Sequence, residues 1–498
     1  MSLPQVSSID AEYDIIFAGG GAAACVTAGR LATADASLKV LILEAGPPTK
    51  DLHIHTQPAR YLSHLRPEST TVRFHVEPHV ETLGGRPLII PCGQCFGGGS
   101  SVNWTVYTRP SASDFDDWET KYKNPGWGSQ DIIPLLQKTN PNLHVVTSAH
   151  VQHILFDANK RACGVQFKWN PKFLPGEDTE PRVSSVLRSL DINVVEELPG
   201  VGDNFQDHSI AFNCFLAAPE AETLDGIIRN NPDVVAATSK EWSENGTGLM
   251  ATNGFDTLIK LRPNEKELEM LGPEFRKVWD AQFAHAPDKP VIFMGPMSSF
   301  IGDVTNVPDR KYFSSAFYLA YPVARGHVHV TSADDVAAPL DFKSGYFENI
   351  ADIQPFILAY KIMREISRRN HFFRGEYAPT HPEFPPGSQA AVIQNGMPIP
   401  FDTPKIVYTK EDDKAIEMYM RKFIGTAWHA LGTCAMKPRE QGGVVDPRLN
   451  VYGVQGLKIA DLSICPSNVA ANTYSAAVAV GEKAAVIIAE DLGIKLIE

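Results

Sequence analysis

The 498-residue sequence lacks features that would mark several classes of protein. It has no apolar run long enough to span a bilayer, and its start, MSLPQVSSIDAEYD, has neither the basic nor the apolar region of a secretion signal. Its 45 lysines and arginines are outnumbered by 58 acids, a formal net charge of -13, so no basic surface for nucleic acid is expected. We expect an unsecreted protein without nucleic-acid or membrane partners.

Cysteines are few and scattered. Seven in the whole chain make no disulfide framework, which fits a reducing compartment such as the cytoplasm. Cys92 and Cys95 form a C-x-x-C, which leaves open a redox pair or half of a zinc site. No second pair lies at zinc-like spacing, and the motif stands beside a glycine-rich loop rather than in a thioredoxin-like unit. Buried, inert thiols are therefore favoured, and no metal site is expected.

The stretch over residues 13–44, YDIIFAGGGAAACVTAGRLATADASLKVLILE, has the pattern of a dinucleotide-binding βαβ unit. An apolar run at 15–18 suits a buried parallel strand, residues 22–34 a helix, and residues 40–43 a second strand. In the G-x-G-x-x-A turn, Gly19 permits the tight bend, Gly21 lets backbone N–H groups approach a pyrophosphate, and Ala24 allows close helix-to-strand packing. Glu44 ends the second strand, where an acid binds a ribose diol. The pattern alone allows NAD, NADP or FAD.

A second glycine-rich stretch, FGGGSSVN at 96–103, predicts a loop whose backbone contacts a ligand. Residues 113–136 predict two short helices separated by a Pro-Gly turn. Three strands at 143–147, 151–156 and 163–167 suggest an antiparallel meander. Each of these elements is inferred from local pattern alone.

The rest of the chain carries weaker signals until its last third. After PGVGDNFQDH at 199–208, residues 325–331 predict a strand, and residues 353–369 predict an amphipathic helix whose basic residues form a solvated face. Residues 411–423 predict another helix, which begins with acids and ends with Arg421 and Lys422. Residues 457–461 read as a buried strand, and residues 474–490 as a long, mostly apolar helix. Asn472 and Thr473 stand where its N-cap belongs.

Taken together, the 13–44 unit, GGGSSVN, PGVGDNFQDH and the ending WH…NTYSAA…GEKAA resemble the glucose-methanol-choline (GMC) oxidoreductases, flavoproteins that oxidise alcohols with FAD. Within that family, WHALGTCAMKPRE, GGVVDPRLNVYGV and DLSICPSN are most similar to fungal alcohol (methanol) oxidases. The resemblance implies an α/β fold: a Rossmann-like FAD-binding domain interleaved with a substrate-binding domain built on an antiparallel sheet. It divides the chain into 10–210 (FAD-binding), 211–428 (substrate-binding) and 429–498 (returning to the FAD domain).

The resemblance also implies site residues. His429 and Asn472 match the family's pair at the flavin N5 edge, with His429 as the base that takes the hydroxyl proton and Asn472 orienting the substrate oxygen. Trp104 and Trp428, beside Asn103 and His429, are expected to wall the substrate pocket and favour small alcohols. The residues implied to bind FAD are Gly19, Gly21, Ala24, Glu44, Gly98, Ser101, Asn103, Asp461 and Thr473.

The implied reaction is oxidation of a primary, short-chain alcohol to an aldehyde, with O2 reduced to hydrogen peroxide. A quinone-linked dehydrogenase, or an enzyme for aryl or natural-product alcohols, is the alternative. The resemblance leaves a homo-oligomer open. The ending LGIKLIE lacks a peroxisomal S-K-L address, so the cytoplasm is expected and the peroxisome is the family's alternative.

The sequence departs from the family's pattern at two places. Between Lys138 and Leu143 a long insertion over the substrate pocket is absent, and after Pro181 a buried strand of the FAD-domain sheet and a second signature are missing. Loss of that strand would leave backbone groups of its neighbours unpaired. A truncated, non-catalytic relative is therefore a third interpretation.

Overall fold

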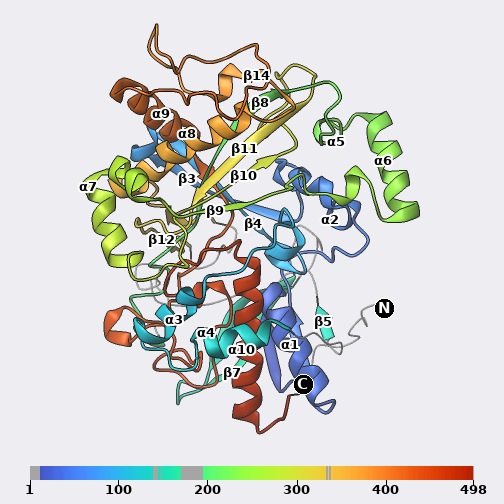
Figure 1. The fold of residues 1–498 in the computed structure, drawn as a ribbon. Helices are drawn as coiled ribbons and strands as arrows, with labels where there is room; N and C mark the ends of the chain where they lie inside the picture. Colours follow the sequence, from blue (N-terminus) through green and yellow to red (C-terminus); the bar gives the residue numbers. More distant parts are fainter. Residues whose placement is uncertain are drawn as a thin grey trace.

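The computed structural model describes residues 12–137, 144–146, 149–169, 195–332, 335 and 338–496. The ribbon has two parts (Figure 1). An antiparallel sheet with helices against it occupies one half, and helices α1 and α10 lie side by side in the other. Both departures from the family's pattern, at 138–143 and after Pro181, fall largely outside the described residues.

The N-terminal unit confirms the predicted βαβ arrangement. Strand β1 (Ile15–Ala18) leads into α1 (Ala22–Ala34) and returns as β2 (Val40–Leu43), parallel to β1. Helix α10 (Tyr474–Leu492) packs along α1. The two helices approach closely because residue 481 is a glycine, whose backbone carbonyl accepts a hydrogen bond of 2.9 Å from the Thr27 hydroxyl.

Strand β1 is more exposed than its sequence predicts. All four residues of β2 are buried, whereas the first three of β1 are only half-buried and Ala18 is exposed. The sheet order is β1-β2-β5, so β1 has one neighbour, and no strand in the described part of the chain pairs with its outer edge. The expectation of a strand buried on both faces is wrong for that reason.

The three-stranded meander predicted over 143–167 is also wrong. Strand β5 (His144–Val146) pairs in parallel with β2 and extends the N-terminal sheet. Strands β6 (Ala149–Phe156) and β7 (Ala162–Trp169) form an antiparallel hairpin by themselves. Local alternation cannot distinguish these pairings, because a strand's partner is chosen by the tertiary fold.

The second sheet is antiparallel throughout. Its order is β14 (Phe373–Glu376), β8 (Ser209–Ala217), β11 (Tyr312–Leu319), β10 (Ile292–Met297) and β9 (Ile259–Leu261), and β15 (Gly425–Thr426) also pairs with β8. Helix α8 (Gln354–Arg368) packs on β10 and β11, beside α7 (Glu265–Gln282) and α9 (Lys410–Phe423). This architecture confirms the predicted α/β fold class. The division into domains stays a prediction.

Two further expectations need correction. Arg364 on α8 is not part of a solvated face: it is buried and forms a bidentate pair with Glu376, at 2.6 and 2.8 Å. Residues 457–461 form no strand; Lys458 makes an isolated bridge with Asn450, and the stretch is half-buried because it faces a cavity.

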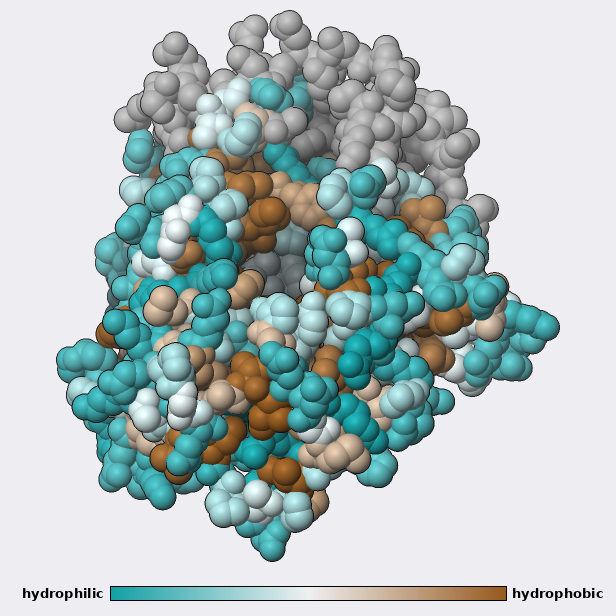
Figure 2. Space-filling view, turned by 90° about the horizontal axis from the view of Figure 1, so that it is seen from above, coloured by the Kyte–Doolittle hydropathy of each residue, from teal (hydrophilic) through white to brown (hydrophobic). Residues whose placement is uncertain are grey.

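Among the described residues, no helix has the length and apolar character needed to cross a membrane. Figure 2 shows a mixed surface with small hydrophobic patches and a recess bordered by hydrophobic side chains.

The remaining helices and strands are α2 (His53–Thr56), β3 (Val72–Val80), β4 (Arg86–Gly93), α3 (Ala112–Thr120), α4 (Ser129–Ile132), α5 (Asp225–Ile228), α6 (Pro232–Asn245), β12 (His327–His329) and β13 (Asp341–Lys343).

Candidate active site

The two glycine-rich motifs lie against each other. Gly97 donates its backbone N–H to the Gly20 carbonyl at 2.8 Å. A β-carbon on Gly98 would lie 3.0 Å from the Gly21 Cα, and Gly98 itself has a positive φ of 52°, so this close approach requires glycine. The expected loop at 96–103 contains one 3-10 turn, Gly98–Ser101. Two motifs far apart in sequence thus build one backbone cradle at the start of α1.

Glu44 supports this cradle from inside the protein. Its two carboxylate oxygens accept backbone N–H bonds of 2.7 Å from Gly20 and Gly46. Burial raises the pKa of this carboxyl, which the backbone hydrogen bonds oppose. The side chain is 6% exposed and does not line the adjoining cavity. Its ribose-binding role remains a prediction, and the observed contacts hold the glycine turn in place.

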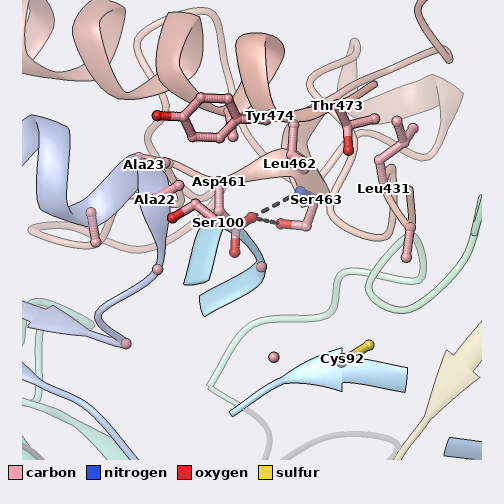
Figure 3. Close-up of a pocket in the computed structure, with 18 of the residues that line it drawn as sticks. Ala22, Ala23, Cys92, Ser100, Leu431, Asp461, Leu462, Ser463, Thr473 and Tyr474 are labelled. Carbon is pink, nitrogen blue, oxygen red and sulfur yellow. Dashed lines mark hydrogen bonds between the residues drawn. The ribbon is translucent and has the colours of Figure 1, made fainter. Parts of the chain in front are cut away.

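A cavity of about 1200 Å³ runs past the cradle to His429 and Asn472. Figure 3 shows Asp461 near Ala22, Ala23 and Ser100, accepting hydrogen bonds from the Ser463 backbone and hydroxyl. Ser101 turns away and donates its hydroxyl to Thr49 at 3.1 Å. Of the residues implied by the resemblance, Gly19, Gly21, Ala24, Asn103, Trp104, Trp428, His429, Asp461, Asn472 and Thr473 line this cavity, whereas Glu44, Gly98 and Ser101 do not.

The cradle fits the pyrophosphate of a dinucleotide cofactor. Among the described residues, a β-carbon on Gly19 or Gly21 would meet no atom within 4 Å, so the backbone there faces open space. This space adjoins the N-terminus of the thirteen-residue helix α1, where backbone N–H groups and the helix dipole favour an anion. The elongated cavity provides room for the remainder of an FAD molecule.

His429 and Asn472 meet in this cavity. The Asn472 side-chain nitrogen and the His429 Nε2 atom are 3.3 Å apart. The Asn472 side-chain oxygen accepts the Thr108 hydroxyl at 2.9 Å, which orients the amide so that its NH2 group faces His429. At the start of α10, Thr473 rather than Asn472 occupies the N-cap position, and its side chain makes no capping hydrogen bond.

His208 determines which ring nitrogen of His429 carries the proton. The Nε2 atom of His208 lies 2.9 Å from the Ala320 carbonyl, which can only accept, so this nitrogen carries the proton. Burial lowers the pKa of His208 to about 4, so the ring is neutral and its Nδ1 is an acceptor. That atom lies 2.8 Å from the Nδ1 of His429, which must therefore be the donor. The Nε2 of His429 is therefore unprotonated, and its lone pair accepts the Asn472 N–H at 3.3 Å.

Electrostatics also favour a neutral His429. Burial, and secondly the neighbouring His208, lower its pKa well below the ordinary value. Asp207 accepts the His429 backbone N–H at 2.8 Å and the Tyr346 hydroxyl at 2.6 Å, which fixes the backbone that carries the imidazole. Burial raises the pKa of Asp207 to about 6. The site thus holds an uncharged imidazole able to take up a proton.

Aromatic rings enclose the same end of the cavity. The rings of Trp104 and Trp428 have centroids 4.6 Å apart, and Trp104 also packs on Tyr61 at 5.0 Å. Trp428 has a positive φ of 60°, with its backbone N–H donated to the Thr426 hydroxyl at 2.7 Å. Both tryptophans line the cavity with His429, and their role as walls of a substrate pocket stays a prediction.

The comparisons with known proteins identify the family. A GMC oxidoreductase model matches residues 13–163, and a second matches residues 322–481. The chain belongs to the GMC oxidoreductase family. The chain is 32% identical to an alcohol oxidase of Pichia angusta, over 98% of this chain and 96% of that protein. It is 31% identical to an alcohol oxidase of Candida boidinii over the same shares.

Solved structures of other GMC-type enzymes share the fold. A formate oxidase of Aspergillus oryzae superposes with a TM-score of 0.77 at 18% identity, over 97% of this chain and 99% of that one. A fungal aryl-alcohol oxidase gives 0.70 at 18% identity, over 97% and 99%. Together with the fitting cradle, the family match confirms two expectations: the protein is an FAD-dependent oxidoreductase, and its cofactor is FAD.

Internal segments are missing relative to the GMC relatives. The alignment with the Pichia angusta protein runs over 642 positions, more than the 498 residues of this chain. The alignment nevertheless covers 98% of this chain and 96% of the relative, so it reaches nearly to both ends of each sequence. The shortening expected from the sequence is therefore internal, as predicted.

The sequence predictions omitted several residues of this GMC site. His208 and Asp207 belong to the PGVGDNFQDH motif, which gave a family signal but no role. Thr108 follows the glycine-rich loop by a few residues and has no distinctive pattern. Their contacts with His429 and Asn472 arise only from tertiary packing.

The thiols of the C-x-x-C motif form no disulfide. Burial raises the pKa of Cys92 to about 11 and that of Cys95 to about 12, as suits unreactive groups.

Proposed function

We propose that the protein is an FAD-dependent alcohol oxidase that converts a primary alcohol to an aldehyde and reduces O2 to hydrogen peroxide. The observation that carries this proposal is the neutral His429, with its Nε2 lone pair beside the Asn472 amide in the FAD cavity. An alcohol needs a group that removes the hydroxyl proton and a donor that holds its oxygen. The nearly full-length similarity to fungal alcohol oxidases supports the same reaction.

Asn472 and His429 have different roles in the proposed reaction. The substrate oxygen accepts the Asn472 N–H while its own proton points at the Nε2 of His429, so the amide positions the alcohol and the imidazole takes the proton. FAD held by the glycine cradle would supply the two-electron chemistry, as acceptor of a hydride from the carbinol carbon and donor of electrons to O2. Because Nδ1–H of His429 is already bonded to His208, the proton is taken at Nε2 without a change of tautomer.

The Trp104 and Trp428 rings, 4.6 Å apart in the cavity, support a small alcohol as substrate. Aryl or natural-product alcohols are the alternative, because the resemblance implies that an insertion over the substrate pocket is absent here. The scattered free cysteines support the cytoplasm as the compartment, with the peroxisome as the alternative.

The test is anaerobic reduction of the bound flavin, followed by its absorbance, with methanol, ethanol and benzyl alcohol as substrates. The wild-type flavin should bleach with at least one of these alcohols, and peroxide should appear when air is admitted. His429→Ala should keep its flavin but slow the bleaching by about 10²–10⁴-fold. His285→Ala, which changes an exposed histidine, is the matched control and should behave as wild type.

Three outcomes separate the alternatives. A flavin that bleaches without peroxide under air indicates a dehydrogenase with another acceptor, such as a quinone. Unchanged bleaching in His429→Ala removes this residue from the role of base. Colourless protein that takes up no added FAD supports the truncated, non-catalytic relative and contradicts the proposal.

A further inference from the structure

A group of metal-ligating side chains lies on the β12–β13 hairpin, on the face opposite the FAD cavity. His327 and His329 are two residues apart on β12, so both side chains stand on one face, with their rings stacked at a centroid distance of 4.8 Å. Asp341 lies opposite His329 in the antiparallel register. Its carboxylate oxygens are 3.4 Å from the His327 Nε2 and 3.8 Å from the His329 Nδ1. One ligand atom from each residue lies within 4.8 Å of the other two.

His329 has a carboxylate at each of its two ring nitrogens. Besides Asp341 at Nδ1, the Asp203 carboxylate lies 3.5 Å from Nε2. A neutral imidazole carries one N–H and can satisfy only one of these acceptors. If Nε2–H faces Asp203, the Nδ1 lone pair and the Asp341 carboxylate face each other, and a cation between them would be bound by both. An imidazole with a carboxylate on one nitrogen and a metal ion on the other is the usual arrangement of a metal-bound histidine.

The position of Asp203 beside the ring is set by the backbone. Gly202 has a positive φ of 89°, and its carbonyl accepts the Val328 N–H at 2.8 Å. A β-carbon on Gly202 would lie 2.5 Å from the Cδ2 atom of His329, so only glycine lets the Asp203 loop approach this closely. The fold thus holds the backbone that carries Asp203 against the His329 ring.

We propose that His327, His329 and Asp341 bind one divalent transition-metal ion of the Zn²⁺ type, with Asp203 orienting His329 from behind. Two imidazoles and a carboxylate suit Zn²⁺, Co²⁺ or Ni²⁺, and solvent can complete the coordination because Asp341 is 63% exposed. The nearby Lys343 ammonium is paired with Glu348 at 2.7 Å, which offsets its repulsion of a cation.

This site is separate from the oxidation chemistry. Side chains alternate along a strand, so Val328 and Phe342, between and beside the ligands, point the other way and line the FAD cavity. The metal ion would connect β12 to β13 on the outer side of the cavity wall. Turnover by the proposed oxidase does not require it, and its test does not depend on the proposed substrate.

The experiment is a calorimetric titration of ZnCl2 into FAD-loaded protein previously treated with a chelator. We expect a single tight site per chain. His327→Gln and His329→Gln should each weaken the affinity about tenfold or more, and Asp203→Asn by about 10–100-fold as an outer-shell partner. The matched control is His79→Gln, because His79 and Glu81 form an exposed histidine–carboxylate pair at 3.3 Å without a second histidine. Its affinity should equal that of wild type.

Flavin content and far-UV circular dichroism identify variants that fold. If a histidine variant does not, Asp341→Asn, an exposed and nearly isosteric change, takes its place and should also weaken binding. Addition of Co²⁺ should give the visible absorption of a nitrogen- and oxygen-ligated ion in wild type and lose it in the variants. Wild-type affinity in His327→Gln and His329→Gln, or equal loss in His79→Gln, would overturn the proposal.

Discussion

His429 acts through a chain of hydrogen bonds that begins at a backbone carbonyl. The Ala320 oxygen fixes the proton of His208, and His208 then fixes the proton of His429 on Nδ1. A histidine in the other tautomer would present N–H, not a lone pair, to the alcohol and could not accept its proton. His208 is therefore a positioning residue for the proposed base.

His208→Leu should lower the rate of flavin reduction about ten- to hundredfold, because a buried N–H left without an acceptor costs about 1–3 kcal/mol and disfavours the productive tautomer. His208→Gln should retain most of the rate, since its amide oxygen can accept from His429. Stopped-flow bleaching under anaerobic conditions measures both. Flavin content should stay constant in the two variants.

The comparison of leucine with glutamine distinguishes tautomer control from packing. Equal losses in both variants would mean that the imidazole of His208 only fills space. A wild-type rate in His208→Leu would show that His429 keeps its tautomer unaided.

At the level of single residues, the sequence predicted some residues of the site and missed others. His429 and Asn472 were found because they stand in motifs that occur together in order, and the structure brings them to 3.3 Å. Their supporting residues His208 and Thr108 have no pattern of their own, because the contacts link residues 221 and 364 positions apart. Ser101 was placed along the cofactor by motif, yet its hydroxyl bonds to Thr49 instead.

Among the elements, those with strong local periodicity were predicted well. The helix at 22–34 and the strand at 40–43 match the observed α1 and β2, and the helix expected at 474–490 is α10, two residues longer. Strand pairing was predicted poorly. Strand β5 joins β2 rather than a meander, and residues 457–461 pair with no strand, because both outcomes depend on partners distant in sequence.

The contact between α1 and α10 depends on Gly481. A β-carbon there would lie 2.7 Å from the Ala23 carbonyl oxygen and 3.0 Å from the Val26 Cβ. Gly481→Val should therefore lower the free energy of unfolding by about 1–3 kcal/mol through overpacking, and it should weaken FAD binding because α1 begins at the cradle. Urea unfolding followed by far-UV circular dichroism and a fluorimetric FAD titration measure the two effects.

Gly425→Val is the matched control. A β-carbon on Gly425 would meet no atom within 4 Å among the described residues, and the residue lies in a short strand, which tolerates valine. It should unfold as wild type does. Wild-type stability in Gly481→Val would show that α10 can move away from α1 without cost.

Across the whole molecule the buried core is unevenly distributed. The largest hydrophobic cluster joins the antiparallel sheet to α7, α8 and α9, and a second surrounds α10. The clusters at β1 and β2 are small. Among the described residues, the N-terminal sheet that carries the cradle is thus supported by much smaller hydrophobic clusters than the antiparallel sheet.

The strand that the resemblance implies is lost from this sheet would account for the small core beside β1. Strand β1 and residues 457–461 both line the cavity, both are partly exposed, and neither pairs with a described strand on that side. The resemblance implies a lost strand of this sheet, which stays a prediction, and the longer alignment with the relatives shows that the chain is shortened internally. A strand beside β1 would cover its apolar side chains and satisfy its outward backbone groups.

The open edge predicts an alternating pattern of hydrogen exchange along β1. The N–H groups of Ile15 and Gly19 donate to carbonyls at the two ends of β2, at 3.3 and 2.8 Å, so the alternate amides of Ile16 and Ala18 point outward. We expect these two amides to exchange fast, while those of β2, which has strands on both sides, are protected. Residue-resolved exchange on FAD-loaded protein, with β2 as internal control, measures this. Protection of Ile16 and Ala18 equal to that of β2 would contradict an open edge and require that this side of the sheet is covered.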